Sequence, residues 1–122
     1  MAKGDDIQER LIDFAVKIID FTAKYPKTPA GRHIANQLLR SGTSPAPNYA
    51  EARAAESTND FIHKLKVVLK ELNESNVWLE ITGRSKMLET ETVNSVMSEC
   101  IELSRIITAS VRTVLKRRNN CQ

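Results

Sequence analysis

The chain has 122 residues, of which 41% are hydrophobic and 27% are charged. This length and this composition are typical of one folded domain and argue against a chain that is disordered by default. The formal net charge of +3 is too small to identify a nucleic-acid partner on its own, so the distribution of the basic residues must decide.

The sequence shows no sign of export or of membrane insertion. Its first residues, Met-Ala-Lys-Gly-Asp-Asp, open no apolar signal-peptide core, and no apolar run approaches the ~20 residues of a membrane span. We therefore expect a soluble, cytoplasmic protein without a membrane partner. The two cysteines, Cys100 and Cys121, fit neither a disulfide framework nor a metal-binding spacing, which predicts reduced thiols.

Helical periodicity begins almost at once, and the first predicted helix spans about residues 5–25. Asp5 and Asp6 supply the cap and the negative charge favoured at a helix start, and Pro26 ends the helix. Apolar residues recur at steps of three and four on one face, at Ile7, Leu11, Phe14, Ile18, Phe21 and Tyr25.

The second predicted helix spans about residues 29–55 and contains an unusual segment. Thr28 is placed as its N-cap with Pro29 at the first helical position. Two prolines and a glycine within residues 42–47 then predict a kink or a break. One alternative is a new helix with Ser44 as N-cap and Pro45 at its first position, and we favour one long helix kinked near residues 42–47.

Two long helices follow, over about residues 58–82 and 90–118. Ser57 and Asp60 resemble a capping box at the start of the first, and Gly83 is placed as its C-terminal stop. The apolar stripe of the second is Val93, Val96, Cys100, Leu103, Ile107, Val111 and Val114. Four amphipathic helices with short connections predict an all-α fold, an antiparallel up-and-down four-helix bundle that occupies residues 1–122 as a single domain.

A run of polar side chains falls on one face of the second helix, because its members are spaced by four, four and three residues. They are Arg40, Ser44, Asn48 and Glu51, and we expect Lys64 and Glu71 of the third helix to face them. One interpretation is a solvated, ion-paired face. The other is a buried polar network between helices or subunits that sets their register and assembly.

Neither a catalytic nor a metal-binding constellation can be recognised. A di-iron bundle needs two Glu-x-x-His motifs, whereas this chain has one comparable spacing, from Asp60 to His63, and its other histidine is His33. No glycine-rich phosphate loop or nucleophile motif is present. We therefore expect no enzyme activity, no catalytic residues, no cofactor and no metal.

Basic residues form three groups that could contact the phosphates of RNA or DNA. They are Lys24, Lys27 and Arg32; Lys66 and Lys70; and Arg112, Lys116, Arg117 and Arg118. Aromatic residues make up only 5% of the chain, so base stacking is an unsuitable mode and phosphate contact is the expected one. The alternative function is a scaffold that recruits a protein partner without nucleic acid.

Residues 40–52, RSGTSPAPNYAEA, resemble the four-helix-bundle proteins encoded within intervening sequences of bacterial 23S ribosomal RNA genes. The resemblance continues through DFIHKL at 60–65, KELNES at 70–75 and Trp78-Leu79, and it covers nearly the whole chain. Tyr49, in place of an aliphatic residue, and Ala52, in place of a glycine, depart from the common form of the family.

The resemblance implies an up-and-down bundle that assembles into a ring-shaped homopentamer, in a family whose molecular function is unknown. The chain is also similar to accessory proteins of diversity-generating retroelements, which form similar pentamers and work with nucleic acid and a reverse transcriptase. The resemblance thus implies self-association, with RNA, DNA or a protein as a further partner.

Overall fold

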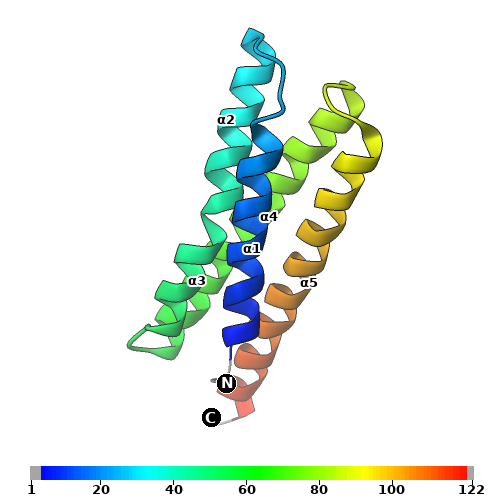
Figure 1. Ribbon diagram of the computed structural model, residues 1–122. Helices are drawn as coiled ribbons and strands as arrows, with labels where there is room; N and C mark the ends of the chain where they lie inside the picture. The colour runs from blue at the N-terminus through cyan, green and yellow to red at the C-terminus, as the bar shows by residue number, and fades with distance from the viewer. Residues whose placement is uncertain (1–3, 121–122) are drawn as a thin grey trace.

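The computed structural model describes residues 4–120, so the prediction of a reduced thiol at Cys121 lies outside the described residues. Five helical segments make up the fold: α1 (Asp5–Thr22), α2 (Pro29–Thr43), α3 (Pro45–Arg53), α4 (Thr58–Arg84) and α5 (Thr90–Asn120). Because α2 and α3 follow one another along a single rod, these segments amount to four helices (Figure 1). No strand occurs among residues 4–120, and the all-helical prediction is correct.

The chain runs the length of the molecule four times (Figure 1). Helix α1 leads from the lower end of the view to the upper end, α2 and α3 return, α4 rises again and α5 descends. Helix α1 packs against α2, α3 and α5, and α4 packs against α2, α3 and α5. Within residues 4–120, no helix is both long and apolar enough to cross a membrane.

The helix starts follow the capping chemistry expected from the sequence, with one exception. The Thr28 side chain accepts a hydrogen bond from the Gly31 amide at 3.0 Å, and the Ser57 side chain accepts one from the Asp60 amide at 3.1 Å. Helix α1 differs, because its N-cap is Gly4 in a left-handed conformation and Asp5 lies in the first turn.

Four helix ends differ from the predicted ones, and one of them is the end of α3, which lies at Arg53 rather than residue 55. Helix α1 ends at Thr22 rather than Tyr25, because the last amides bond three residues back in a tighter turn. Helix α4 runs through Gly83 to Arg84, and Lys86 (φ 58°) takes the left-handed conformation that closes it. The amides of Lys86 and Met87 bond back to the carbonyls of Gly83 and Thr82, as in a Schellman motif. Helix α5 extends to Asn120 rather than residue 118.

The predicted kink in the second helix is a break in backbone hydrogen bonding at Ser44. The backbone of Ser44 keeps helical dihedral angles (φ −76°, ψ −35°), so the rod continues through it. Pro45 and Pro47 lack amide protons and cannot bond to the carbonyls of Ser41 and Thr43. The Ser44 side chain accepts no hydrogen bond from an amide in the first turn of α3, so Ser44 does not act as the N-cap of a new helix, which was the alternative.

All four rods contribute to one core. Its largest fully buried side chains are Leu11, Phe14, Ile18, Leu38, Leu65, Leu72, Leu79, Leu103 and Ile107. Close approach of α2 to α1 depends on Gly42, where an added Cβ would lie 2.8 Å from Cγ1 of Ile18. Leu39, next to the buried Leu38 in α2, is 37% exposed.

Candidate polar network and nucleic-acid interface

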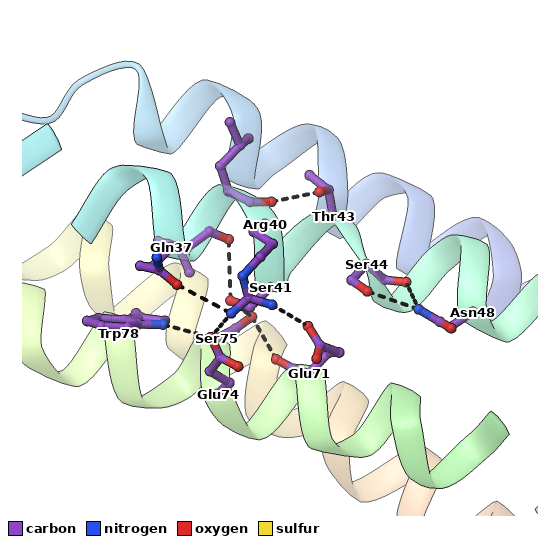
Figure 2. Close-up of polar contacts among 12 residues, drawn as sticks. Gln37, Arg40, Ser41, Thr43, Ser44, Asn48, Glu71, Glu74, Ser75 and Trp78 are labelled. Carbon is purple, nitrogen blue, oxygen red and sulfur yellow. Dashed lines mark hydrogen bonds and ion pairs between the residues drawn. The ribbon is translucent and has the colours of Figure 1, made fainter. Parts of the chain in front are cut away.

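Arg40 of α2 reaches across to two carboxylates of α4 (Figure 2). Its Nη1 lies 3.2 Å from Oε2 of Glu71, and its Nη2 pairs with Glu74. The indole Nε1 of Trp78 donates to the same Glu74 carboxylate at 3.1 Å, and Gln37 accepts a longer bond from Arg40 at 3.5 Å. The arginine therefore links α2 to α4 through two carboxylates that lie three residues apart on one face of α4.

This cluster combines features of both interpretations of the polar face. Glu71 is 8% exposed, so its carboxylate is buried at the contact between the helices. The Arg40 side chain is 51% exposed, and the ion pair is therefore screened by water on one side. A half-exposed arginine paired with a buried carboxylate links α2 to α4 and adds little to the stability of the fold.

The other members of the predicted network make two separate contacts. Asn48 Nδ2 donates to the carbonyl and to the hydroxyl of Ser44, both at 2.9 Å, and so spans the helix break (Figure 2). Lys64 Nζ lies 3.3 Å from Glu51 Oε1 and joins α4 to α3 at the surface. The six residues thus form three sets of contacts along one interface, without a hydrogen bond connecting the sets.

Beneath this surface lies a polar contact that the sequence did not reveal. The hydroxyls of Ser41 and Ser75 are fully buried and hydrogen-bond to each other at 2.8 Å (Figure 2). Ser75 also lies 2.9 Å from the carbonyl of Glu71, one turn earlier in α4. Two small side chains allow α2 and α4 to approach closely, and the hydrogen bond between them gives each buried hydroxyl a polar partner.

The three basic groups do not form one continuous surface. Lys24, Lys27 and Arg32 lie around the α1–α2 connection at one end of the bundle, and Arg117 lies near the other end (Figure 1). The side chains of the three groups are exposed except that of Arg118, which is half-buried and donates to Asn59 at 2.7 Å. Phosphate contact at these residues stays a prediction.

A surface groove between α4 and α5 gathers polar and basic side chains. It has a volume of about 480 Å³ and is lined by Leu69, Asn73, Asn76, Ile101, Ser104, Arg105, Thr108, Ala109 and Arg112. No carboxylate lines it. Arg105 was missed in the sequence because it stands apart from the C-terminal basic run, although it lies seven residues from Arg112 on the same helix face.

A second, more apolar groove lies where the start of α1 meets α3 and the end of α5. Its volume is about 800 Å³, and it is lined by Gly4, Ile7, Tyr49, Arg53, Phe61, Ile106, Ala109, Ser110, Thr113, Val114 and Arg117. Tyr49, which departs from the common family form, is buried at its wall, and burial raises the pKa of its hydroxyl. Ala52, the other departure, is also buried.

The described residues offer no group of three or more His, Cys, Asp or Glu side chains that could hold a metal ion. Cys100 lies fully buried in the core, where its thiol is 3.2 Å from the carbonyl of Leu72. Burial, with a smaller contribution from Glu99, raises the pKa of this thiol to about 12. A thiol in this environment stays protonated and is a poor nucleophile.

Comparison with known proteins identifies the family. Residues 5–109 match the family described as 23S rRNA-intervening sequence protein. A crystal structure of a protein of unknown function from the S23 ribosomal protein family of Bacteroides thetaiotaomicron is 31% identical, with a TM-score of 0.81. The similarity covers 86% of this chain and 97% of that one, whereas no functionally curated protein matches. The chain therefore belongs to the 23S rRNA-intervening sequence protein family, whose function is unknown.

Proposed function

We propose that this chain forms a cytoplasmic, non-enzymatic homo-oligomer that binds RNA or DNA through phosphate contacts. The observation that carries the proposal is the α4–α5 groove, in which Arg105 and Arg112 stand among amide and hydroxyl side chains without a carboxylate. Arginine, asparagine, serine and threonine are the side chains that contact phosphate oxygens in nucleic-acid complexes. The groove is therefore suited to a polyanion.

The length of the groove favours a backbone rather than a single anion. Arg105 and Arg112 are two helical turns apart, which corresponds to ~10 Å along α5. Lys116 follows Arg112 by one further turn, so the line of positive charge extends toward the end of the helix. Spaced cations of this kind bind successive phosphates and release counterions, so the affinity should fall steeply with salt.

The resemblance to pentameric family members supports the oligomeric part of the proposal, in which each subunit is an antiparallel up-and-down bundle. The course of the chain in Figure 1 supports that subunit topology. The similarity to accessory proteins of diversity-generating retroelements favours a nucleic-acid partner. An oligomer would repeat the groove around its surface, and several weak phosphate sites acting together bind more tightly than one.

Fluorescence anisotropy with labelled structured RNA and duplex DNA tests this proposal. We expect Arg105→Ala/Arg112→Ala to weaken binding and to reduce the slope of log affinity against log salt by about 1.5–2, because two phosphate contacts are lost. Lys17→Ala/Lys86→Ala removes the same charge at two exposed positions outside the groove and outside the three basic groups, and is the matched control. Absence of binding by the unmodified chain at low salt would refute the proposal.

A protein-binding scaffold is the second candidate, and the groove of about 800 Å³ favours it. Ile7, Phe61 and Ile106 line it with apolar side chains, and Arg117 borders it together with Arg53, which pairs with Asp5 at 2.7 Å. This composition suits an amphipathic helix that carries acidic residues beside its apolar face. A stoichiometric protein complex that survives nuclease and is lost on Ile106→Glu would favour this function over nucleic-acid binding.

A further inference from the structure

The groove of about 800 Å³ lies where α1 and α4 begin and where α3 and α5 end, at the lower end of the view in Figure 1. Side chains from all four rods line it, and Ile7, Phe61 and Ile106 are partly exposed apolar members of that lining. No carboxylate of residues 4–120 lines the groove. A concave site of this volume, mostly apolar and with a few polar groups, is typical of small-molecule binding sites in proteins.

One buried hydroxyl in this lining has no partner. The Tyr49 side chain of α3 is 5% exposed, yet its hydroxyl makes no hydrogen bond with any of residues 4–120. The other tyrosine, Tyr25, is also buried, and its hydroxyl hydrogen-bonds to Thr82. Tyrosine hydroxyls normally have such a partner when they are buried, so the one at Tyr49 is suited to a ligand. Burial raises the pKa of this hydroxyl, which therefore keeps its proton and can donate it.

The hydroxyl end of the Tyr49 ring is the part that reaches the groove. Gly4 also lines the groove, and a Cβ added to Gly4 would lie 3.0 Å from the Tyr49 hydroxyl oxygen and 3.2 Å from Nε of Arg53. Gly4 has no side chain to stand between these two groups and the groove. The other hydroxyls of the lining, those of Ser110 and Thr113, donate to carbonyls of their own helix, so Tyr49 carries the uncommitted one.

Both charged side chains that line the groove are arginines. Arg53 is paired with Asp5 at 2.7 Å, so its charge is largely matched. Arg117 is exposed and makes no ion pair with any of residues 4–120, so its charge is available to a ligand. Three exposed carboxylates stand on the same helices as the lining residues without lining the groove themselves: Asp6, Asp60 and Glu102.

The apolar and polar groups are separated along the groove. Ile106 and Arg117 line it eleven residues apart on α5, which corresponds to ~16 Å. Because α5 descends in Figure 1, Arg117 lies at the end of the bundle where α1 begins with Gly4, and Ile106 lies further into the bundle. The free hydroxyl of Tyr49, beside Gly4, is therefore nearer the outer end. This distribution is complementary to a molecule with an apolar body and one anionic end.

We propose that this groove binds a small amphiphilic anion, an alkyl chain that ends in one carboxylate. The carboxylate accepts a hydrogen bond from the Tyr49 hydroxyl and pairs with Arg117, and the alkyl chain runs along α5 toward Ile106. A narrow ligand can place its anionic end beside a hydroxyl this deeply buried, whereas the backbone of a bound helix, itself ~10–12 Å wide with its side chains, stays further out. The inference goes beyond the proposed function and does not depend on nucleic-acid binding, which uses the α4–α5 groove.

Isothermal titration calorimetry of the full chain with decanoate, kept below the concentration at which it forms micelles, tests the proposal. We expect saturable binding of one decanoate per subunit. Binding should be at least 10-fold weaker for 1-decanol, which has the chain without the charge, and for acetate, which has the charge without the chain. Tyr49→Phe keeps the ring and should weaken decanoate binding by about 10-fold, because one hydrogen bond to a charged group is lost. Arg117→Ala should weaken it by about 3-fold or more, because an exposed charge is lost.

Two matched variants serve as controls. Tyr25→Phe removes the hydroxyl of the other buried tyrosine, and Lys116→Ala removes the charge next to Arg117 that does not line the groove. Both should bind decanoate as the wild type does. Thermal melts without ligand distinguish a binding role from a structural one. Tyr49→Phe should melt no lower than the wild type, because its hydroxyl has no partner to lose, whereas Tyr25→Phe should melt lower, because it loses the bond to Thr82.

The outcomes that overturn the proposal are distinct. Absence of saturable decanoate binding at millimolar concentration overturns the ligand, and so does an acidic amphipathic peptide that binds the groove when decanoate does not. Equal binding of 1-decanol overturns the requirement for an anion. A Tyr49→Phe chain that binds decanoate as the wild type does overturns the placement of the carboxylate. Anisotropy on the same variants measures nucleic-acid binding, which Tyr49→Phe should leave unchanged, so failure of either proposal can be told from failure of the other.

Discussion

Gly42 stands where α2 approaches Ile18 of α1 closely, and replacing it with alanine tests that approach. A Cβ at this position would lie 2.8 Å from Cγ1 and 2.9 Å from Cγ2 of Ile18, well inside van der Waals contact. Ile18 is itself fully buried, and close-packed protein interiors leave few voids into which such a side chain could move. Gly83 of α4 provides the control, because a Cβ there would meet only Cγ1 of Val93 at 3.5 Å.

Two effects of opposite sign determine the result at Gly42. Alanine in a helix is favoured over glycine by up to about 1 kcal/mol. Overpacking a core typically costs about 1–3 kcal/mol. We therefore expect Gly42→Ala to lower the free energy of unfolding by about 1–2 kcal/mol, whereas Gly83→Ala, which adds no clash, should raise it by up to about 1 kcal/mol.

Urea denaturation followed by circular dichroism measures both variants. Ile18→Ala removes the two carbon atoms that the new methyl group would meet, so it should be less destabilising in the Gly42→Ala background than in the wild type. The difference is a coupling energy of about 0.5–3 kcal/mol. If Gly42→Ala stabilised the chain as Gly83→Ala is expected to, the close approach would not exist.

Three further results are expected. Burial raises the pKa of Cys100, Tyr25 and Tyr49 in the folded state, so these groups ionise more readily when the chain is unfolded. The free energy of unfolding should therefore fall as the pH rises from about 9 toward 12, by about 1 kcal/mol per pH unit for each group that ionises only when unfolded. Chemical denaturation at several pH values measures this decline, and Cys100→Ala should make it shallower. A Cys121→Ser chain, whose one thiol is Cys100, should react with a disulfide reagent at pH 8 only after denaturant unfolds it, and fast reaction of the native chain would contradict the burial. Ser75→Ala should destabilise by about 1–3 kcal/mol, and Ser41→Ala/Ser75→Ala by less than the two single changes together, which thermal melts of the four proteins would show.

Periodicity was sufficient to predict the helical class and the buried faces of the first and last helices. The stripe from Leu11 to Phe21 and the stripe from Val93 to Val111 lie in the core as expected, because a side chain at every third or fourth position must share one side of a helix. Proline and capping residues located the helix starts for the same local reason. Thr28 and Ser57 bond to the amides that their positions imply.

Features that depend on tertiary contact were less accessible. Gly83 resembled a stop signal, but the left-handed residue that closes α4 is Lys86, because the turn is held by its two backbone hydrogen bonds rather than by residue type. Ser75 follows the apolar spacing of α4, three residues after Leu72 and four before Leu79, but nothing in the sequence pairs it with Ser41, and only the packing of α2 on α4 brings the two hydroxyls together. Arg40 was predicted to face Glu71, yet its sequence position could not reveal that the carboxylate alone is buried.

The break at Ser44 divides hydrogen bonding without dividing the core. Buried residues continue through it at helical spacing, from Leu38 through Ser41 and Pro45 to Tyr49 and Ala52. Helix α3 is consequently held by its side chains more than by the backbone ladder of α2. Opening that starts at the end of α3 near Ala54 can stop at Ser44, so native-state amide exchange should divide this rod into two cooperative units, with α3 the less protected of the two.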